Sequence, residues 1–171
     1  MIRIFFYANS THYVLFTEQA LEHMYAHAQR WPWQREAGGE IFSTAPDASG
    51  LIIASAAGPN AGDRRSRHSW NPDTVAADLV RHNEFAQGRH AVGLWHTHPE
   101  VSPTPSGLDR ETTREYLESF KGQRSRYLMV IIGNRGKTPA MAVWAITGEA
   151  GGRWEELKEM PATDALCINH A

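Results

Sequence analysis

The sequence contains very little cysteine, no long hydrophobic run and no excess of one charge. Its single cysteine, Cys167, excludes an internal disulfide and a zinc site made of CxxC pairs. The apolar stretch within residues 1–10 is too short for the hydrophobic region of a signal peptide, and no run approaches the ~20 apolar residues that span a bilayer. We therefore expect a cytoplasmic protein, and any metal that it binds must have histidine and carboxylate ligands.

The charge and composition are those of an ordinary globular protein. The formal net charge is −2 over 171 residues, so no basic excess favours nucleic-acid or membrane binding. Hydrophobic residues make up 42% of the chain and charged residues 21%, a balance that supports a core without disulfides. This length suits one domain. We predict a single domain over residues 1–160, followed by a C-terminal tail over 161–171.

Strand and helix patterns alternate along the chain. Apolar or alternating stretches predict strands at 2–7, 13–16, 38–44, 51–56, 91–98, 127–133 and 140–146. Cap residues followed by helical periodicity predict helices over 17–31, 71–87 and 106–120, with Thr17, Asn71 and Ser106 as caps. The stretch after Gly148 fits no single pattern. These elements predict an α/β fold with a mixed, largely antiparallel sheet flanked by helices.

The most informative stretch is HTHPEVSPTPSGLD, residues 96–109. Because side chains two apart on a strand share a face, His96 and His98 can converge on one metal ion while Thr97 points away. Asp109 lies about one turn into the following helix if Ser106 is its cap. Two imidazoles and one carboxylate leave a fourth zinc position open, which distinguishes a catalytic zinc site from a structural one.

The same residues have simpler interpretations. Ser106 and Asp109 fit a capping box, with aspartate in place of the usual glutamate. His96 and His98 fit polar surface at the end of a strand. The cap interpretation is compatible with metal binding, because a fixed helix start would also orient Asp109.

The stretch resembles the zinc motif of the JAMM/MPN+ metalloproteases, H-[ST]-H-P-x6-S-x-x-D. That family has an upstream glutamate before a glycine-rich strand, and Glu36 in EAGGEIF is similar to it. The resemblance implies that His96, His98 and Asp109 bind Zn²⁺ with water in the fourth position. It also implies that Glu36 is the general base, that Ser106 donates a hydrogen bond to the oxyanion, and that the fold is the layered MPN architecture shared with cytidine deaminases.

Family resemblance further implies a zinc isopeptidase or peptidase. Members cleave after the C-terminal glycine of ubiquitin or a ubiquitin-like protein, and this short chain resembles the small prokaryotic members, some of which lie in antiphage operons. The implied partner is a ubiquitin-like protein or its conjugate, with its C-terminal tail in a groove beside a sheet edge. The resemblance implies neither a nucleic-acid nor a membrane partner.

Three other classes of protein fit the sequence less well. A RadC-like protein linked to DNA metabolism carries a similar motif, but it is not expected to have the strand that Glu36 opens. A non-catalytic MPN scaffold loses the metal ligands, whereas all three are present here. A cytidine deaminase needs HxE and PCxxC motifs, which a chain with one cysteine cannot provide.

Several residues outside the motif carry weaker expectations. Glu40 departs from the usual apolar residue, and we expect an edge-strand charge facing solvent, with a place near Glu36 as the alternative. His23 and His27 predict a solvated helix face. We expect His68 at the surface, with a place in the cleft as the alternative.

The arginine and tryptophan residues are also open to two interpretations. Residues 64–67 (RRSR) predict a solvated basic loop, and a surface for an acidic partner is the alternative. The tryptophans at 31, 33, 70, 95 and 144 are mostly expected in the core. Trp70 and Trp95 flank the motif in sequence, so a contact with a substrate tail is the alternative for these two.

Overall fold

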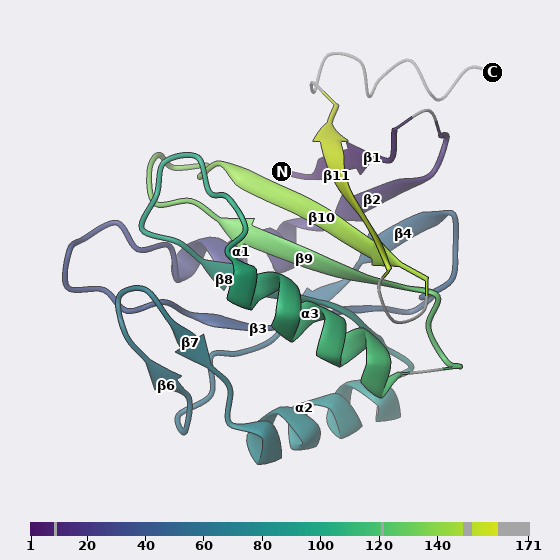
Figure 1. Cartoon of the computed structure of the whole chain (residues 1–171), viewed down its shortest axis with the longest axis horizontal. Coiled ribbons are helices and arrows are strands. Elements are labelled where there is room, and N and C mark those ends of the chain that lie inside the picture. Colours follow the sequence, from purple (N-terminus) through teal and green to yellow (C-terminus); the bar gives the residue numbers. More distant parts are fainter. Residues whose placement is uncertain (9, 121, 149–151, 161–171) are drawn as a thin grey trace.

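The computed structural model describes residues 1–8, 10–120, 122–148 and 152–160. In these ranges the chain forms a nine-stranded sheet, a two-stranded ribbon and three helices (Figure 1). The sheet strands are β1 (Arg3–Phe6), β2 (Tyr13–Phe16), β3 (Gly38–Ser43), β4 (Gly50–Ile53), β5 (Ser55–Ala56), β8 (His90–Thr97), β9 (Arg126–Ile132), β10 (Met141–Thr147) and β11 (Arg153–Glu159). The ribbon is β6 (Arg64–Arg65) and β7 (Trp70–Asn71), and the helices are α1 (Glu18–Ala26), α2 (Thr74–Ala86) and α3 (Gly107–Ser119).

The large sheet is mixed and nearly closes into a barrel. Its strand order is β4-β2-β1-β11-β10-β9-β8-β3-β5. All neighbouring strands are antiparallel except the pairs β2–β4 and β8–β9, which are parallel. The two end strands, β4 and β5, are separated in the chain by Ala54 alone, so the sheet curls until its edges approach. The predicted mixed α/β class with a largely antiparallel sheet is confirmed.

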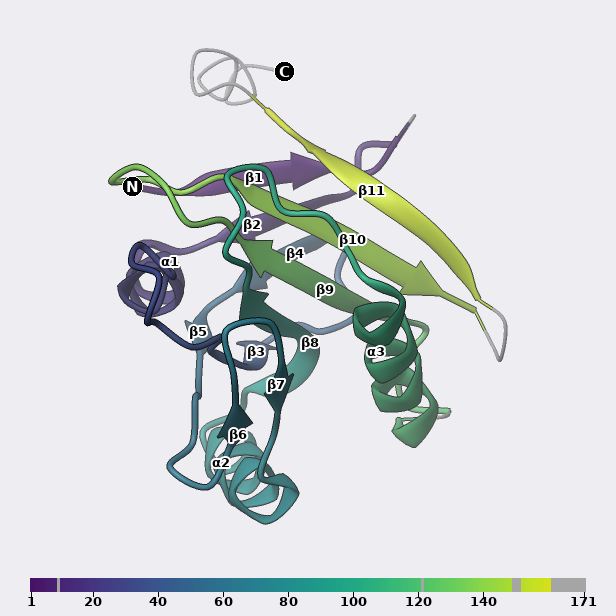
Figure 2. The same cartoon turned by 60° about the vertical axis from the view of Figure 1, so that its left-hand side comes forward.

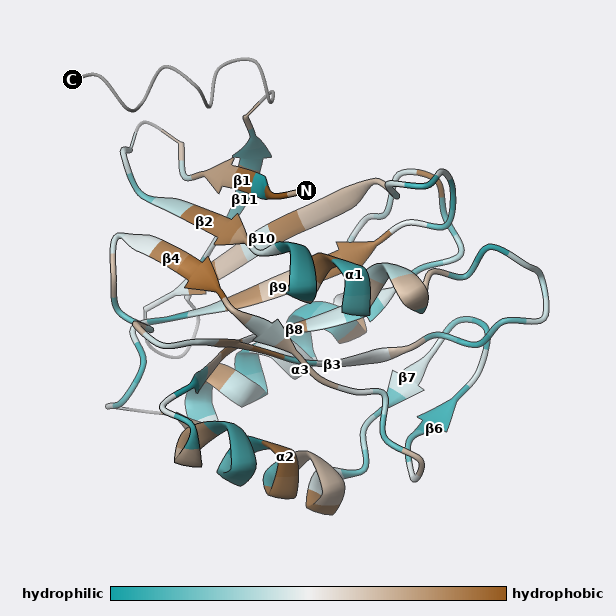
Figure 3. Ribbon diagram, turned by 180° about the vertical axis from the view of Figure 1, so that it is seen from behind, coloured by the Kyte–Doolittle hydropathy of each residue, from teal (hydrophilic) through white to brown (hydrophobic). Residues whose placement is uncertain are grey.

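Hydrophobic side chains gather in two clusters, one on each side of β8 and β9. The larger cluster joins α1 to the inner faces of the sheet and contains Trp95. The smaller one joins α3 to the opposite side through Leu94, Leu117 and Tyr127. Figure 2 shows α1 and α3 on the two sides of these strands, and Figure 3 shows hydrophobic β2 and β4 beside α1 and β9 behind it. Strand β8 is therefore covered on both faces.

The expected elements occur in the structure, with local differences. Thr17 caps α1 as predicted, its side chain accepting a hydrogen bond from the Ala20 amide. The cap of α2 is Asp73 rather than Asn71, because the Asp73 carboxylate accepts from two amides of the first turn while Asn71 belongs to β7. The stretch predicted as one strand at 51–56 is broken into β4 and β5. The predicted tail 161–171, with Cys167, lies outside the described residues.

Glu40 is buried, so the expectation of a solvent-facing charge is wrong. Its side chain is 3% exposed and forms an ion pair with Arg81 of α2, with Nη2 3.0 Å from Oε1. The Tyr127 hydroxyl donates to the same oxygen at 3.4 Å. The Arg81 guanidinium also lies over the rings of Tyr116 and Phe120, 6.0 and 5.5 Å from their centroids. Burial raises the pKa of Glu40, and the charge of Arg81 opposes that rise.

Replacing Arg81 by leucine is expected to lower the free energy of unfolding by about 2–4 kcal/mol. The substitution leaves the Glu40 carboxylate buried without its cation, and the partial exposure of Arg81 holds the loss below that of a fully buried pair. Urea denaturation measures the change. A double variant, Glu40→Leu with Arg81→Leu, should recover part of the loss because it removes the orphaned charge. An Arg81→Leu protein within about 0.5 kcal/mol of the parent would contradict this role.

Candidate metal centre

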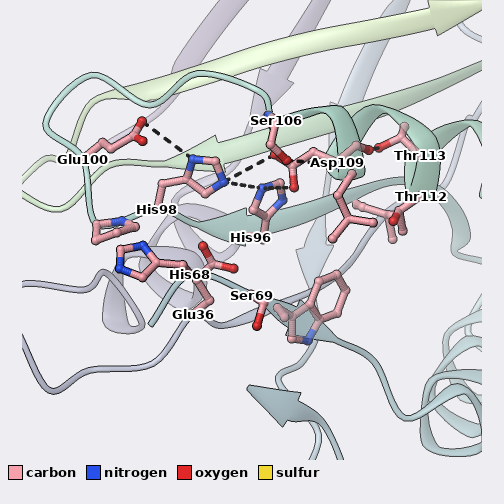
Figure 4. Close-up of a pocket in the computed structure, with 14 residues that line it drawn as sticks. Glu36, His68, Ser69, His96, His98, Glu100, Ser106, Asp109, Thr112 and Thr113 are labelled. Atoms are coloured by element: carbon pink, nitrogen blue, oxygen red, sulfur yellow. Dashed lines mark hydrogen bonds and ion pairs between the residues drawn. The ribbon is translucent and has the colours of Figure 1, made fainter. Parts of the chain in front are cut away.

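The end of strand β8 and the residue after it place two histidines on one side, His96 within the strand and His98 just beyond it. His96 and His98 continue the side of the strand that carries Leu94, while Trp95 and Thr97 point to the opposite side. Both imidazoles are buried, at 5% and 8% exposure. Their Nε2 atoms lie 3.0 Å apart (Figure 4). The period of the strand thus brings the two ring nitrogens to one point, as expected from the sequence.

Asp109 reaches the same point from the first turn of α3. The Ser106 side chain accepts a hydrogen bond from the Asp109 amide at 3.2 Å, and the Asp109 carboxylate accepts one from the Ser106 amide at 2.7 Å. Asp109 Oδ1 lies 3.2 Å from His96 Nε2, and Asp109 Oδ2 lies 3.5 Å from His98 Nε2. The capping box and the convergence with the histidines therefore coexist, because the cap holds the carboxylate against the strand (Figure 4).

The three side chains fit a divalent metal ion. Ligand atoms at roughly 2.0–2.2 Å from a tetrahedral ion lie roughly 3.3–3.6 Å from one another. Here one ligand atom from each of His96, His98 and Asp109 lies within 4.8 Å of the others. Burial alone would raise the pKa of Asp109, but hydrogen bonds with the two histidines hold it far below its ordinary value. A carboxylate whose ionised form is favoured, beside two imidazoles, is a suitable set of ligands for a transition metal.

Glu36 lies just before β3 and opposite the histidine strand. The next residue, Ala37, is joined to Thr97 by two hydrogen bonds, one to its carbonyl at 2.9 Å and one from its amide to the threonine hydroxyl at 3.0 Å. This pairing places Glu36 in the cavity lined by His96, His98 and Asp109. Burial raises its pKa to about 7, although the nearby His98 opposes the rise. A carboxylate with that pKa can both accept and release a proton near neutral pH.

The glycines after Glu36 make room for other parts of the site. A Cβ at Gly38 would lie 2.6 Å from the Trp70 ring, and one at Gly39 would collide with the carbonyl of Ala57. Gly38 pairs with His96 in the sheet, so the Trp70 ring packs beside the metal ligands. This close approach explains why the strand begins with two residues that lack side chains.

The cavity around these residues has a volume of about 200 Å³ and continues into a groove. Trp70, Leu108 and Thr112 line both the cavity and the groove, which runs between β7 and α3. His68 is exposed and also lines the cavity, so the expected surface position and the cleft alternative both hold. Trp95 is fully buried, and its indole N–H donates to the Ala57 carbonyl at 2.9 Å. Of the two tryptophans considered for substrate contact, only Trp70 is therefore placed at the site.

One feature near the site contradicts the expectation from the sequence, and another was not predicted. His23 and His27 are half-buried and pack against Trp95, with centroids 5.7 and 5.8 Å from it, so the expected solvated face is wrong. Burial lowers the pKa of His27. Glu100 was not singled out, but its carboxylate lies 3.8 Å from His98 Nδ1 (Figure 4). Its position directly after HTHP is the only sequence signal that would have found it. A carboxylate at that nitrogen favours the tautomer that leaves Nε2 free for a metal.

Comparisons with known proteins show the family of this chain. The family model described as prokaryotic homologs of the JAB domain matches residues 17–147, a range that includes Glu36 and the three possible metal ligands. A protein of Pseudomonas aeruginosa (strain BWHPSA011 / Pa011) named CD-NTase/cGAS isopeptidase is 34% identical over 122 residues, 69% of this chain and 75% of that protein. None of the helices in the described ranges has the length and apolar character needed to cross a bilayer.

The fold also occurs among solved structures. Protein DSY2949 of Desulfitobacterium hafniense has a TM-score of 0.59 with this chain at 20% identity, over 85% of this chain and 88% of that one. This likeness shows a shared fold and nothing of activity. The family match and the curated relative carry the assignment: the chain belongs to the prokaryotic JAB-domain proteins.

Proposed function

We propose that this protein is a zinc-dependent isopeptidase or peptidase that hydrolyses the bond after the C-terminal tail of a ubiquitin-like protein or its conjugate. The observation that carries the proposal is the buried set of His96, His98 and Asp109 with Glu36 in the same cavity. The relative named CD-NTase/cGAS isopeptidase supports an isopeptide bond as the target and adds CD-NTase proteins to the candidate partners.

Each residue of the site has a separate role in hydrolysis. His96, His98 and Asp109 would hold the ion, and Zn²⁺ when bound polarises a carbonyl and makes water more acidic. Glu36 accepts the proton of the attacking water and delivers it to the leaving amine, a double role that its pKa of about 7 suits. The cap uses the Ser106 hydroxyl oxygen as an acceptor, so the hydroxyl hydrogen is available to the oxyanion that develops on the carbonyl oxygen.

We place the substrate tail in the groove between β7 and α3. It begins at the cavity and is lined by Trp70, Leu108 and Thr112, then by residues of the β6–β7 ribbon and by Tyr116. A cavity of about 200 Å³ admits a scissile bond and its immediate neighbours but no folded domain, which favours an extended tail. An extended peptide beside the short strand β7 is the arrangement of strand addition.

A panel of fusion proteins tests the proposed function. The Zn²⁺-loaded protein is incubated with ubiquitin-like proteins and CD-NTases joined through their C-terminal residue to a reporter domain, including any encoded beside its own gene. Cleavage at the junction, located by intact-mass spectrometry, supports the proposal. Absence of cleavage across the panel with fully metal-loaded protein would contradict it.

Replacing Ser106 by alanine is expected to lower kcat by about 100-fold, as for loss of one oxyanion donor. It also removes the helix cap, which costs about 1 kcal/mol of stability. Ser106→Gly separates the two effects, since glycine at a cap costs only a few tenths of a kcal/mol yet has no hydroxyl. Equal loss of kcat in both variants supports the catalytic role. A normal kcat in the Ser106→Gly enzyme would show that Ser106 acts only as a helix cap.

The activity of the metal-loaded protein is expected to fall on acidification. Burial raises the pKa of Glu36 to about 7, and a general base acts only while ionised, so protonation at lower pH removes it. A bound cation favours the carboxylate, which places the acid limb at or below pH 7. Plots of kcat/KM between about pH 5 and 9, with metal content measured at each point, test this. A limb centred well above pH 7 would contradict the assignment.

A further inference from the structure

Two tryptophans lie at the surface in the loop between α1 and β3. Trp31 and Trp33 are 56% and 73% exposed, which corrects the expectation of core positions. Their rings stack with centroids 5.5 Å apart and an interplanar angle of 5°. We call this pair the tryptophan platform. Large apolar side chains left together in water are a feature of binding surfaces, where tryptophan is enriched among the residues that dominate affinity.

The backbone under the tryptophan platform is held by hydrogen bonds on both sides. The Gln34 side chain accepts from the Trp31 amide at 2.8 Å, and the Gln34 amide donates to the Trp31 carbonyl at 3.0 Å. The Arg67 guanidinium donates to the carbonyls of Trp31 and Pro32. These bonds hold the loop between α1 and β3 in place and leave the rings of Trp31 and Trp33 exposed.

Buried Gln29 connects the platform to the metal centre. It is 1% exposed, and its amide nitrogen donates to the carbonyls of Gln34 at 3.2 Å and Arg67 at 2.8 Å. Its amide oxygen accepts from the Thr97 hydroxyl at 3.2 Å. Because Thr97 lies between His96 and His98, the platform has a defined position relative to the metal ligands.

The platform lies within a basic surface. The segments 29–37, 67–68 and 133–140 carry five cationic side chains and one carboxylate, Glu36, in a chain whose net charge is −2. The Arg30 guanidinium donates to the Gly136 carbonyl at 2.9 Å, and the Arg67 guanidinium donates to the carbonyls of Trp31 and Pro32, so both outer segments are joined to 29–37. Within the described parts of the chain, none of the five forms an ion pair. We call these cations the basic rim: Arg30, Arg35, Arg67, Arg135 and Lys137.

The tryptophan platform lies outside the groove, because neither Trp31 nor Trp33 lines it. Figure 4 shows Thr112 and Thr113 of α3 at one end of the cavity and Glu100 at the other, with Glu36 and His68 below the metal ligands. The groove continues from the cavity between α3 and the β6–β7 ribbon. The platform joins the side of His68, through the bonds of its sequence neighbour Arg67. When the tail occupies the groove, the side of the cavity next to the tryptophan platform is free for the amine half of the scissile bond.

We propose that the tryptophan platform and the basic rim bind the protein on the leaving-group side of the scissile bond, and that this partner presents an acidic surface with an apolar spot. This inference rests on the proposed hydrolase function. Stacked tryptophans provide the apolar contact, and unpaired arginines provide complementary charge that accelerates encounter and selects the partner.

A substrate series with one acyl tail and three leaving groups tests the inference. A tail cleaved in the fusion panel is joined to a fluorescent protein with an acidic engineered surface that contains one exposed apolar spot, to its counterpart with a basic surface and the same spot, and to a short neutral peptide. The parent enzyme should cleave the acidic fusion with a higher kcat/KM than the basic one, and added salt should reduce the difference because it screens exposed charges.

Two variants identify the surface. Trp31→Ala with Trp33→Ala, and separately Arg135→Glu with Lys137→Glu, should each lower kcat/KM on the acidic fusion by about 10-fold, the effect expected from loss of a dominant contact. The short peptide does not reach this surface, so its cleavage should change by less than about twofold. Phe85→Ala on α2, 64% exposed, and Arg153→Glu on β11 are matched controls away from the rim.

The outcomes separate this inference from the function on which it rests. If the parent cleaves no fusion, the proposed function fails and the leaving-group role fails with it. If all three leaving groups are cleaved equally, or the platform variant loses activity equally on the short peptide, the hydrolase stands and this inference is overturned. Selective loss on the acidic fusion supports it.

Discussion

Replacing Glu36 by glutamine is expected to lower kcat by about 1,000-fold, within the range for loss of a general base. Glutamine has nearly the same shape but cannot accept the proton of the attacking water. Glu36 is not one of the three converging ligands, so metal content should stay unchanged. The measurements are kcat on the best fusion and the metal-to-protein ratio by elemental analysis. Loss of turnover with full metal content would separate proton transfer from metal binding.

Glu100 provides the matched control for this substitution. It is a second carboxylate in the same cavity, but it is about half exposed and faces Nδ1 of His98 rather than the strand that Glu36 precedes. Glu100→Gln should lower kcat far less than Glu36→Gln does. Comparable losses would remove the special role of Glu36, and full activity in Glu36→Gln would contradict the mechanism outright.

Removing the metal is expected to abolish turnover, and adding Zn²⁺ back is expected to restore it. Asp109→Asn should have the same effect without recovery, because it replaces the ionised oxygen ligand by a neutral amide. The side-chain oxygen of asparagine can still accept the hydrogen bond from the Ser106 amide, so the helix cap should survive. Asp109→Ala removes both interactions. Metal binding is measured by titration and turnover on the fusion substrate.

The stability of these two variants distinguishes the cap from the ligand. Thermal unfolding in chelator removes the stabilisation that any bound metal adds. Under that condition both variants lose the interaction of the carboxylate with the two histidines, and Asp109→Ala should be about 1 kcal/mol less stable than Asp109→Asn, because only asparagine keeps the capping interaction. A purified parent protein with no affinity for zinc would favour the non-catalytic scaffold instead. Full turnover in chelator would exclude a metal-dependent mechanism.

Helices and strands were predictable where one buried side of the element gives its own sequence a clear hydrophobic pattern. Strand β8 and the start of α3 follow directly from the motif, because a covered strand is apolar and the Ser106 cap has its own signal. Strand β11 was missed. Its sequence RWEELKE is mostly charged, and it pairs with β1 from the other end of the chain and with β10. Its pairing is decided by contacts across the sheet rather than by its own residues.

The candidate site divides in the same way. The sequence by itself determined which residues can bind a metal, because the spacing of His96, His98 and Asp109 and the strand period are local properties. The family resemblance, rather than a local pattern, implied Glu36 as the base. Only the tertiary structure decided that Glu36 meets them, since β3 must pair with β8 from far along the chain. It likewise decided that Glu40 is buried against Arg81 and that Trp31 and Trp33 stay exposed. Burial is set by what packs over a residue, and no local pattern contains that information.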